Sequence, residues 1–385
     1  MKRLEYYIKN NAVLQFIFKF GLSFVMKTIS FFIPINNKMI LFTAHNGGIN
    51  DSPRLIYEQL IRQNNMDYVI VWGVNKNYLN TIFNGRTVRI NSFKYFLISM
   101  RAKYWVASVN IERGLNYKKR NQVYLNTWHG IPIKKIGNDV LGRRDFNFSK
   151  VNYFVVSSDY EIPIYRRALK VRDNSFLRVG LPRNMELFEK KNEDFIQQLR
   201  IKLGIGNDKR IILYAPTWRE SDDSGKSYTI KPPINLDLWK NTLSNDFVVL
   251  FRLHPYTEKA LQIQFDSFCI DASNYPNLNE LIILSDILIT DYSSIAFDYA
   301  LTGKPMLCFA YDFGEYKNRR GLYLDLETEF PGGVIQDQIM LLDRIMQSDA
   351  STIFNKVDSF SNKYNHFFDN PAENCLKILL GPKIQ

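Results

Sequence analysis

Short apolar segments alternate with helix-like segments along most of this chain, and this alternation restricts the fold more than any other feature. Residues 39–44, 68–72, 104–107, 123–125 and 151–156 have the composition of strands, whereas residues 52–63 and 92–101 have helical patterns. Strands that are apolar at nearly every position are typical of a parallel sheet covered by helices on both faces. The sequence therefore predicts an α/β fold whose ligands bind beyond the carboxyl ends of the strands.

A second series of strands follows the polar run at residues 190–194. Its strand candidates are residues 210–214, 247–251, 287–290 and 305–309, and residues 352–380 are expected to be helical. A chain of 385 residues is long enough for two domains, each with its own core. We predict two Rossmann-like domains that face a cleft, with residues 37–190 in the N-terminal domain and residues 191–351 in the C-terminal domain. Residues 352–385 would form a C-terminal helical segment.

The first 36 residues differ from the rest, because aromatic and aliphatic side chains alternate there with spaced lysines. Lys19 and Lys27 interrupt the apolar run, so no uncharged stretch approaches the ~20 residues that a membrane-spanning helix needs. No small-residue cleavage site follows, which argues against a secretory signal. The pattern is typical of an amphipathic helix in a membrane interface, and the alternative is a helix packed on its own domain. We predict that residues 1–36 associate with a membrane.

The charge of the chain limits the classes of binding partner, and its cysteine content indicates the cellular compartment. The chain has 50 Lys and Arg residues against 38 Asp and Glu, a net charge of +12, which favours nucleic acid, an anionic membrane surface or a phosphorylated substrate as partner. Nucleic acid is not expected, because the lysines are dispersed and no nucleic-acid-binding motif is present. Cys269, Cys308 and Cys375 are too far apart for a disulfide framework or a zinc site, which indicates a reducing cytoplasm.

His129 is the first candidate for chemistry. It stands just past the strand candidate at residues 123–125, is followed by Gly130, and has Lys134 and Lys135 close behind it. A titratable imidazole at a strand tip near positive charge suits proton removal beside an anionic substrate. The alternative is a structural histidine that is hydrogen-bonded in a turn.

Three polar loops follow strands of the second series. They are Ala215-Pro216-Thr217-Trp218-Arg219, Arg252-Leu253-His254-Pro255 and Thr290-Asp291-Tyr292-Ser293-Ser294. The third loop opens a helix that runs to about Thr302, so its serines would offer hydroxyl and N–H groups to an anion. Arg252 and His254 alternate at one strand end and can reach the same phosphate cluster. Three such loops on one sheet edge predict a diphosphate site.

Several common catalytic signatures are missing from the sequence. It has no G-x-x-x-x-G-K-[ST] loop, no H-E-x-x-H motif, no paired Cys or His ligands and no Asp-x-Asp pair at a strand end. We therefore expect a transfer reaction without a metal or other cofactor, in which cationic groups and helix dipoles take up the charge of the leaving group.

Four motifs in a fixed order carry a resemblance to a known family. Trp-His-Gly-x-Pro-x-Lys-Lys, Ala-Pro-Thr-Trp-Arg, Arg-x-His-Pro and Thr-Asp-Tyr-Ser-Ser-x-x-Phe-Asp resemble the CDP-glycerol glycerophosphotransferases of teichoic-acid synthesis, of the primase and polymerase type. The similarity extends from about Leu41 to Tyr323. It implies a GT-B fold, with residues 37–190 as acceptor domain and residues 191–351 as CDP-polyol-binding domain.

The resemblance also implies a reaction and a location. Polyol phosphate, with glycerol phosphate as the first expectation and ribitol phosphate as the other, would pass from a CDP-polyol to a hydroxyl of a lipid-linked acceptor of the undecaprenyl diphosphate type. CMP would be released. The enzyme would be peripheral on the cytoplasmic face of the bacterial cell membrane. Primase, polymerase and capsule roles stay open, and the alternative is a GT-B glycosyltransferase or epimerase that uses a sugar nucleotide.

Carried over residue by residue, the resemblance makes His129 the general base and His254 a second catalytic residue. The residues that it implies for binding the donor are Gly130, Ile131, Pro132, Ile133, Arg183, Pro216, Thr217, Arg252, His254, Ser293, Ser294 and Asp298. This sequence departs from the family motif at Ile131, where the polymerases usually have threonine. This difference counts against glycerol as the polyol of the donor.

Overall fold

The computed structural model describes residues 12–64, 67–81, 84–143, 145–217, 219, 232–253, 261, 263–347 and 351–381. The chain divides into two compact units. The first unit comprises the chain up to residue 129, residues 137–183 and the chain from residue 367 onward. The second unit comprises residues 130–136 and 184–366. Each unit is built on a parallel sheet, which confirms the predicted α/β fold.

The first unit has a parallel sheet of seven strands in the order β3-β2-β1-β4-β5-β6-β7. Its strands are β1 (Asn36–Thr43), β2 (Val69–Val74), β3 (Arg86–Arg89), β4 (Ala102–Ala107), β5 (Val123–Asn126), β6 (Tyr153–Val156) and β7 (Phe176–Arg178). The strand order reverses direction at the neighbours β1 and β4, and ligands of open α/β sheets bind at such a switch point. Thr43 pairs with Ala107, and Ala107 with Asn126, so the loops after β1, β4 and β5 begin side by side.

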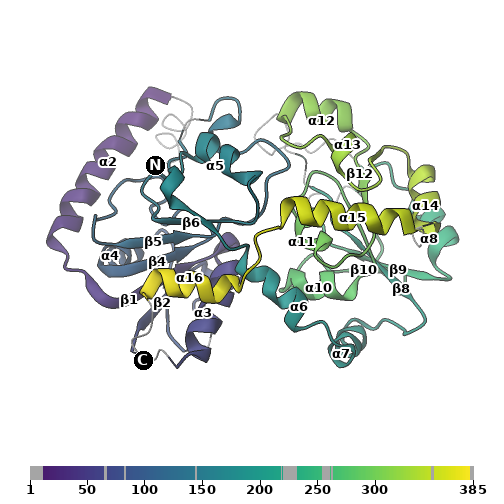
Figure 1. Ribbon diagram of the computed structural model, residues 1–385, viewed down its shortest axis with the longest axis horizontal. Helices are drawn as coiled ribbons and strands as arrows, with labels where there is room; N and C mark the ends of the chain where they lie inside the picture. Colours follow the sequence, from purple (N-terminus) through teal and green to yellow (C-terminus); the bar gives the residue numbers. More distant parts are fainter. Residues whose placement is uncertain are drawn as a thin grey trace. The chain divides into compact units, whose positions relative to one another are not determined.

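Helices cover this sheet. They are α2 (Ala12–Phe32), α3 (Asp51–Arg62), α4 (Phe93–Arg101), α5 (Glu161–Leu169) and α16 (Pro371–Leu380), with short 3-10 turns η1 (His45–Gly47), η2 (Lys76–Tyr78), η3 (Gly137–Asp139) and η4 (Asp173–Ser175). A further 3-10 turn, η5 (Pro182–Met185), contains the boundary between the two units. The Ser92 side chain caps α4 by accepting a hydrogen bond from the Tyr95 N–H, in agreement with the predicted start of this helix. Figure 1 shows α16 beside α3, although these helices are far apart in the sequence.

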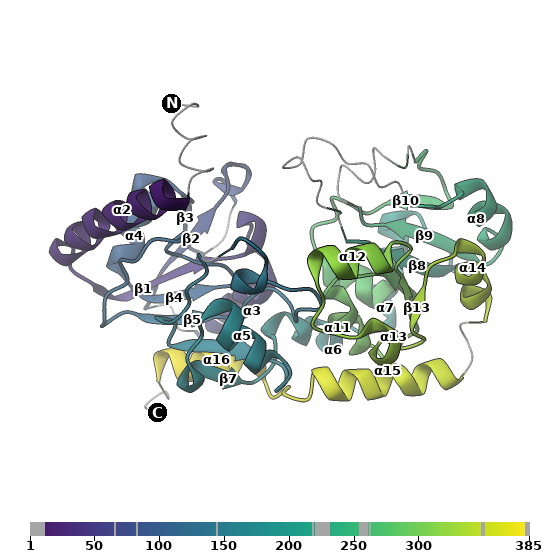
Figure 2. The ribbon, with the colours of Figure 1, turned by 90° about the horizontal axis from the view of Figure 1, so that it is seen from above.

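The second unit has a parallel sheet of six strands in the order β10-β9-β8-β11-β12-β13. Its strands are β8 (Arg210–Tyr214), β9 (Phe247–Phe251), β10 (Cys269–Asp271), β11 (Ile287–Thr290), β12 (Met306–Phe309) and β13 (Val334–Ile335). Its helices are α6 (Glu186–Glu189), α7 (Glu193–Leu203), α8 (Leu236–Leu243), α10 (Leu278–Leu284), α11 (Ile295–Ala300), α12 (Phe313–Arg320), α13 (Leu326–Glu329), α14 (Gln338–Met346) and α15 (Ser351–Tyr364). Figures 1 and 2 both show α15 alongside α11.

The apolar strands of each sheet form the hydrophobic core of its unit. Every residue of β9 and of β11 is buried, because helices pack on both faces of the sheet. The strand order of the second sheet reverses at β8 and β11, so the loops after these two strands occupy the switch point of this unit.

The chain departs from the predicted ranges at several places. Residues 184–190, predicted in the N-terminal domain, belong to the second unit. Residues 352–380 form two helices instead of one, because Pro371 cannot continue a helix and Asn370 before it has a positive φ of 38°. As a result α15 belongs to the second unit and α16 to the first, while His366 lies in the connection. Residues 130–136 belong to the second unit, because their backbone pairs with residues 321–323.

The N-terminal segment is helical where the structure describes it, and α2 presents two apolar faces. Met26 and Ser30 are buried against the first unit, and the Ser30 hydroxyl donates to the carbonyl of Tyr117. On the opposite side Phe20, Phe24 and Phe31 are 68%, 67% and 82% exposed. In the part of the chain that the structure describes, no helix is both long and apolar enough to cross a membrane.

Candidate active site

His129 lies in a tight turn after β5. Trp128 before it has a φ of 52°, and the Trp128 N–H donates to the side-chain oxygen of Asn126 at 2.8 Å, which closes the turn. The turn places the His129 Nδ1 atom 2.9 Å from the carbonyl oxygen of Ser108, the residue after β4. Because a carbonyl only accepts hydrogen bonds, Nδ1 carries the proton and Nε2 keeps its lone pair. The imidazole is thus oriented and in the tautomer that a general base requires.

Burial determines the protonation state of this histidine. It lowers the pKa of His129 to about 4, and the neighbouring His45 acts in the same direction. The hydrogen bond to Ser108 and the negative charge of Asp51 oppose this shift without reversing it. His129 is therefore neutral at pH 7 and ready to accept a proton.

The sequence prediction missed His45, which lies in η1 directly after β1. Its ring stacks on that of His129, with 4.5 Å between the centroids and 17° between the planes. The His45 backbone N–H donates to the Ser108 hydroxyl at 2.9 Å. The sequence signal was only that His45 follows an apolar strand, as His129 does; that these strand ends lie at the same sheet edge is known from the structure.

Arg183 lies in the first unit and pairs with Asp51, the first residue of α3. Its Nη1 donates to Asp51 Oδ1 at 3.0 Å, and its backbone N–H donates to the Ser52 hydroxyl at 3.3 Å. Burial alone would raise the pKa of the Asp51 carboxyl, but the Arg183 guanidinium and the Ser52 N–H hold this pKa below its usual value. The Asp51 carboxylate thus pairs with Arg183, and its negative charge also favours a higher pKa of His45 and of His129.

The second unit collects the predicted anion-binding loops at one sheet edge. The loops after β9, β8 and β11 are neighbours because these strands are adjacent in the sheet. The Ala215 N–H donates to the carbonyl of Ile289, and the Thr290 hydroxyl donates to the carbonyl of Ala215 at 2.8 Å. Arg252 is half-buried, and its Nη1 donates to the carbonyls of Ala272 and Tyr275. His254 lies outside the described residues.

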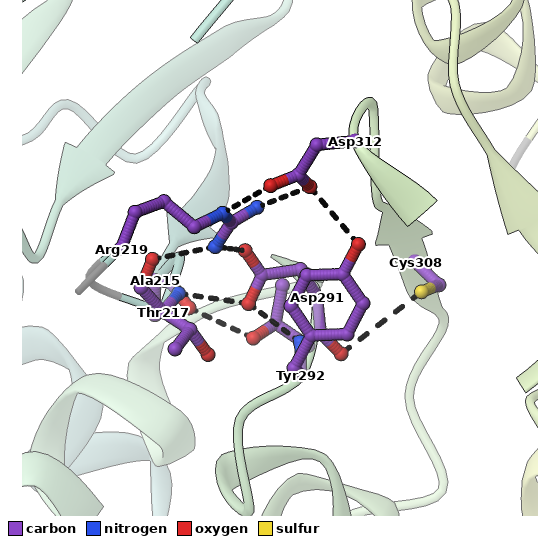
Figure 3. A network of polar contacts seen from close by, with 8 residues as sticks. Ala215, Thr217, Arg219, Asp291, Tyr292, Cys308 and Asp312 are labelled. Carbon is purple, nitrogen blue, oxygen red and sulfur yellow. Dashed lines mark hydrogen bonds and ion pairs between the residues drawn. The ribbon is translucent and has the colours of Figure 1, made fainter. Parts of the chain in front are cut away.

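Arg219 joins the loops after β8 and β11 to the loop after β12 (Figure 3). Its guanidinium donates two hydrogen bonds to Asp312, at 2.6 and 2.8 Å, and one to Asp291 Oδ2 at 2.7 Å. Asp291 Oδ1 in turn accepts from the Thr217 N–H at 2.7 Å, and Asp312 accepts from the Tyr292 hydroxyl. The two carboxylates more than offset burial and raise the pKa of Arg219. The network fixes the loops after β8, β11 and β12 relative to one another.

The remaining predicted donor residues lie in the second unit. Ser293 and Ser294 are half-buried before α11, and the Ser293 hydroxyl accepts from the Ile295 N–H at 3.4 Å. Asp298 is buried within α11, which ends at Ala300, before the predicted Thr302. Within the described chain, the hydroxyl oxygen of Thr217 is buried without a hydrogen-bond partner.

The segment after His129 is bound by the second unit. The Ile133 carbonyl accepts from the Tyr323 N–H at 2.8 Å, and the Lys135 N–H donates to the Gly321 carbonyl at 3.0 Å. Gly130 to Ile133 are all buried there. The predicted residues therefore form two groups, with His129 and Arg183 in the first unit and the rest that are described in the second. No cluster of three or more His, Cys, Asp or Glu side chains suited to a metal ion occurs in the described ranges.

Comparison with known proteins identifies relatives over almost the whole chain. The profile of the CDP-Glycerol:Poly(glycerophosphate) glycerophosphotransferase family matches residues 25–378. The teichoic acid glycerol-phosphate transferase of Staphylococcus aureus is 32% identical over 83% of this chain and 86% of its own length. The solved wall teichoic acid polymerase TagF superposes with a TM-score of 0.81 at 31% identity, covering 93% of this chain and 90% of the TagF chain. A TagF variant soaked with CDPG gives a TM-score of 0.79 at 28% identity, covering 98% of this chain and 97% of that one.

Proposed function

Since the chain belongs to the CDP-glycerol:poly(glycerophosphate) glycerophosphotransferase family, we propose that it transfers polyol phosphate from a CDP-polyol to a hydroxyl of a lipid-linked acceptor. The predicted family and enzyme class are confirmed by this membership. Glycerol phosphate is the first choice of polyol phosphate, because the Staphylococcus aureus relative is a glycerol-phosphate transferase. The role in the cell would be teichoic-acid or related surface-polymer synthesis.

His129 takes the acceptor proton in this proposal. The acceptor oxygen attacks the phosphorus that carries the polyol, the proton moves to His129 Nε2, and the bond from this phosphorus to the bridging oxygen breaks. CMP leaves with that oxygen, and a phosphodiester remains on the acceptor. The single observation that supports this role best is the hydrogen bond from Nδ1 to the Ser108 carbonyl, which leaves Nε2 as the acceptor in a neutral imidazole.

The test of the reaction is CMP release from CDP-glycerol and from CDP-ribitol with a lipid-linked acceptor analogue. His129→Ala should lose about 10²–10⁴-fold in turnover while donor binding is largely kept. His366→Ala is the matched control, because this histidine is exposed in the connection after α15 and should be dispensable. Near-normal turnover of His129→Ala would rule it out as the base. No CMP release from either donor, together with tight binding of a UDP- or GDP-sugar, would favour the glycosyltransferase alternative.

The second unit is proposed to bind the diphosphate of the donor. Arg252, Thr217 and the two serines before α11 supply a guanidinium and hydroxyl groups at adjacent strand ends, and His254 completes the motif in the sequence. Arg252→Ala and His254→Ala should weaken donor binding as well as turnover, measured by calorimetric titration with CDP-glycerol. Unchanged donor affinity in both variants would remove these residues from the site.

We also propose that α2 lies on the anionic cytoplasmic face of the cell membrane, where the enzyme meets its lipid-linked acceptor as a peripheral protein. Support comes from the exposed rings of Phe20, Phe24 and Phe31 and from the exposed Lys27 on the same helix. Burying one such side chain in an apolar phase is worth about 1.5–3 kcal/mol. Three such side chains together are worth roughly 4.5–9 kcal/mol, so the triple Phe→Ser variant should lose about a thousandfold or more in affinity for vesicles that contain phosphatidylglycerol.

The control for α2 is Phe93→Ser, because Phe93 is 71% exposed in the same unit but lies on α4. This variant should bind vesicles like the parent protein. Equal vesicle binding by the triple α2 variant and the parent would refute the membrane role of this helix.

A further inference from the structure

His45 has no role in the reaction described above, yet it is in face-to-face contact with the proposed base. The ring centroids of His45 and His129 are 4.5 Å apart, and the planes differ by 17°. Ser108 binds both residues, since its hydroxyl accepts from the His45 N–H and its carbonyl accepts from His129 Nδ1, each at 2.9 Å. The two imidazoles are therefore held as a pair by one residue at the switch point of the first sheet.

Stacking restricts the orientation of the His129 ring but does not occupy the ring edge that carries Nε2. The His129 ring also contacts the ring of Trp128, with 4.2 Å between the centroids. Stacked rings meet at their faces, so the edge that carries Nε2 is not used by the contact with His45. For the same reason the pair cannot exchange a proton through a hydrogen bond, and His45 is not a proton relay.

The charge of His45 decides whether His129 can become an imidazolium. When the base accepts the proton of the acceptor, a positive charge forms on its ring, and a protonated His45 would face this charge at stacking distance. The other charged groups that act on the pair are Asp51 at the start of α3 and Arg183 in η5. Arg183 is itself a cation, and Asp51 is already paired with it, so Asp51 cannot fully offset a second positive charge on the histidines.

We propose that His45 is a positioning residue for His129, whose ring fixes the plane of the base and whose neutral form is required for turnover. The inference rests on the proposed function, because it takes His129 as the base. It implies that one proton on either imidazole abolishes activity as the pH falls, and that the pair titrates as a unit because the first proton repels the second.

The experiment is the pH dependence of kcat/KM for CMP release by the parent enzyme, His45→Phe and His45→Ala. His45→Phe keeps an aromatic face and should retain the neutral-pH rate within about threefold, but its acid limb should move to lower pH, because the ring at position 45 can no longer take up an inactivating proton. His45→Ala should lower the neutral-pH rate by about ten- to a hundredfold at unchanged donor affinity, because the base is no longer held in place. Donor binding at each pH shows that the variants are folded.

Two results would overturn the inference. An acid limb at the same pH in the parent and in His45→Phe would mean that the charge of His45 does not matter. A neutral-pH rate of His45→Ala equal to that of the parent would mean that the stack does not position the base. Failure of the proposed function itself is distinguishable, because then the parent releases no CMP or His129→Ala stays active.

Discussion

Arg219 is the residue whose loss should most disturb the second unit. Its side chain is 3% exposed, and the side chains of its partners Asp291 and Asp312 are 0% and 8% exposed. Arg219→Met keeps much of the volume but leaves two buried carboxylates without a cation. Removing one partner of a buried ion pair costs about 3–5 kcal/mol, because the remaining charge is uncompensated in a medium of low polarity.

Amide hydrogen exchange followed by mass spectrometry measures this loss unit by unit. Each ~1.4 kcal/mol is a factor of ten in an equilibrium constant, so the protected amides of β8, β11 and β12 should exchange roughly a hundred to several thousand times faster in Arg219→Met. The amides of the first unit should be unaffected. Donor affinity should fall as well, since Arg219 fixes the loop of Thr217 through Asp291.

The matched control is Arg166→Met on α5, which breaks an ion pair with Asp173 whose side chains are both more than half exposed. Exposed pairs contribute about 0–1 kcal/mol, so exchange in the first unit should change by less than about tenfold. Arg219→Lys should lie between the parent and Arg219→Met, because an ammonium cannot form the paired hydrogen bonds to Asp312. If Arg219→Met loses no more protection than Arg166→Met, the network does not stabilise the unit and the reasoning is wrong.

The other predictions concern the first unit. The acid limb of kcat/KM should lie below 6.5, the ordinary histidine value, because burial lowers the pKa of His129 to about 4 and the neutral base therefore persists as the pH falls. Initial rates of CMP release measured down to about pH 4 test this, and a limb at 6.5 or above contradicts it. Asp51→Asn should slow turnover and destabilise the first unit by roughly 1–3 kcal/mol in urea unfolding, because Arg183 loses its partner. Arg183 overcomes the effect of burial and holds the pKa of Asp51 below its usual value, so the carboxylate stays charged at about pH 5. The loss of unfolding free energy in Asp51→Asn should therefore be as large at about pH 5 as at about pH 7. A clearly smaller loss of unfolding free energy at the lower pH would show that the Asp51–Arg183 ion pair does not stabilise the unit in this way.

The long strands were predictable because their residues are apolar on both faces. Segments such as Phe247–Phe251 and Ile287–Thr290 have this pattern and form central strands. The edge strand Arg86–Arg89 escaped prediction, since it is short and three of its four residues are polar. It is a strand because β2 beside it offers free backbone groups, which is a property of the assembled sheet and not of the local sequence.

The same rule explains what could be predicted of the site. His129 and the loops after β8, β9 and β11 became candidates because each follows an apolar strand. His45 follows β1 in the same way, but its contact with His129 requires that β1, β4 and β5 be neighbours, and the strand order cannot be read from a single sequence. Asp312 was missed for a related reason, since only the folded loop after β12 brings it to Arg219.

The Trp-His-Gly motif was treated as one site, but the structure divides it. His129 is fixed by Ser108 in the first unit, whereas the residues from Gly130 to Ile136 belong to the second unit and pair with residues 321–323. Ile131 is 1% exposed in this segment, so its side chain contributes to packing. A threonine there would bury a hydroxyl, at a cost unless it finds a hydrogen-bond partner. Any effect of Ile131 on the choice of polyol would therefore act through the packing of this segment.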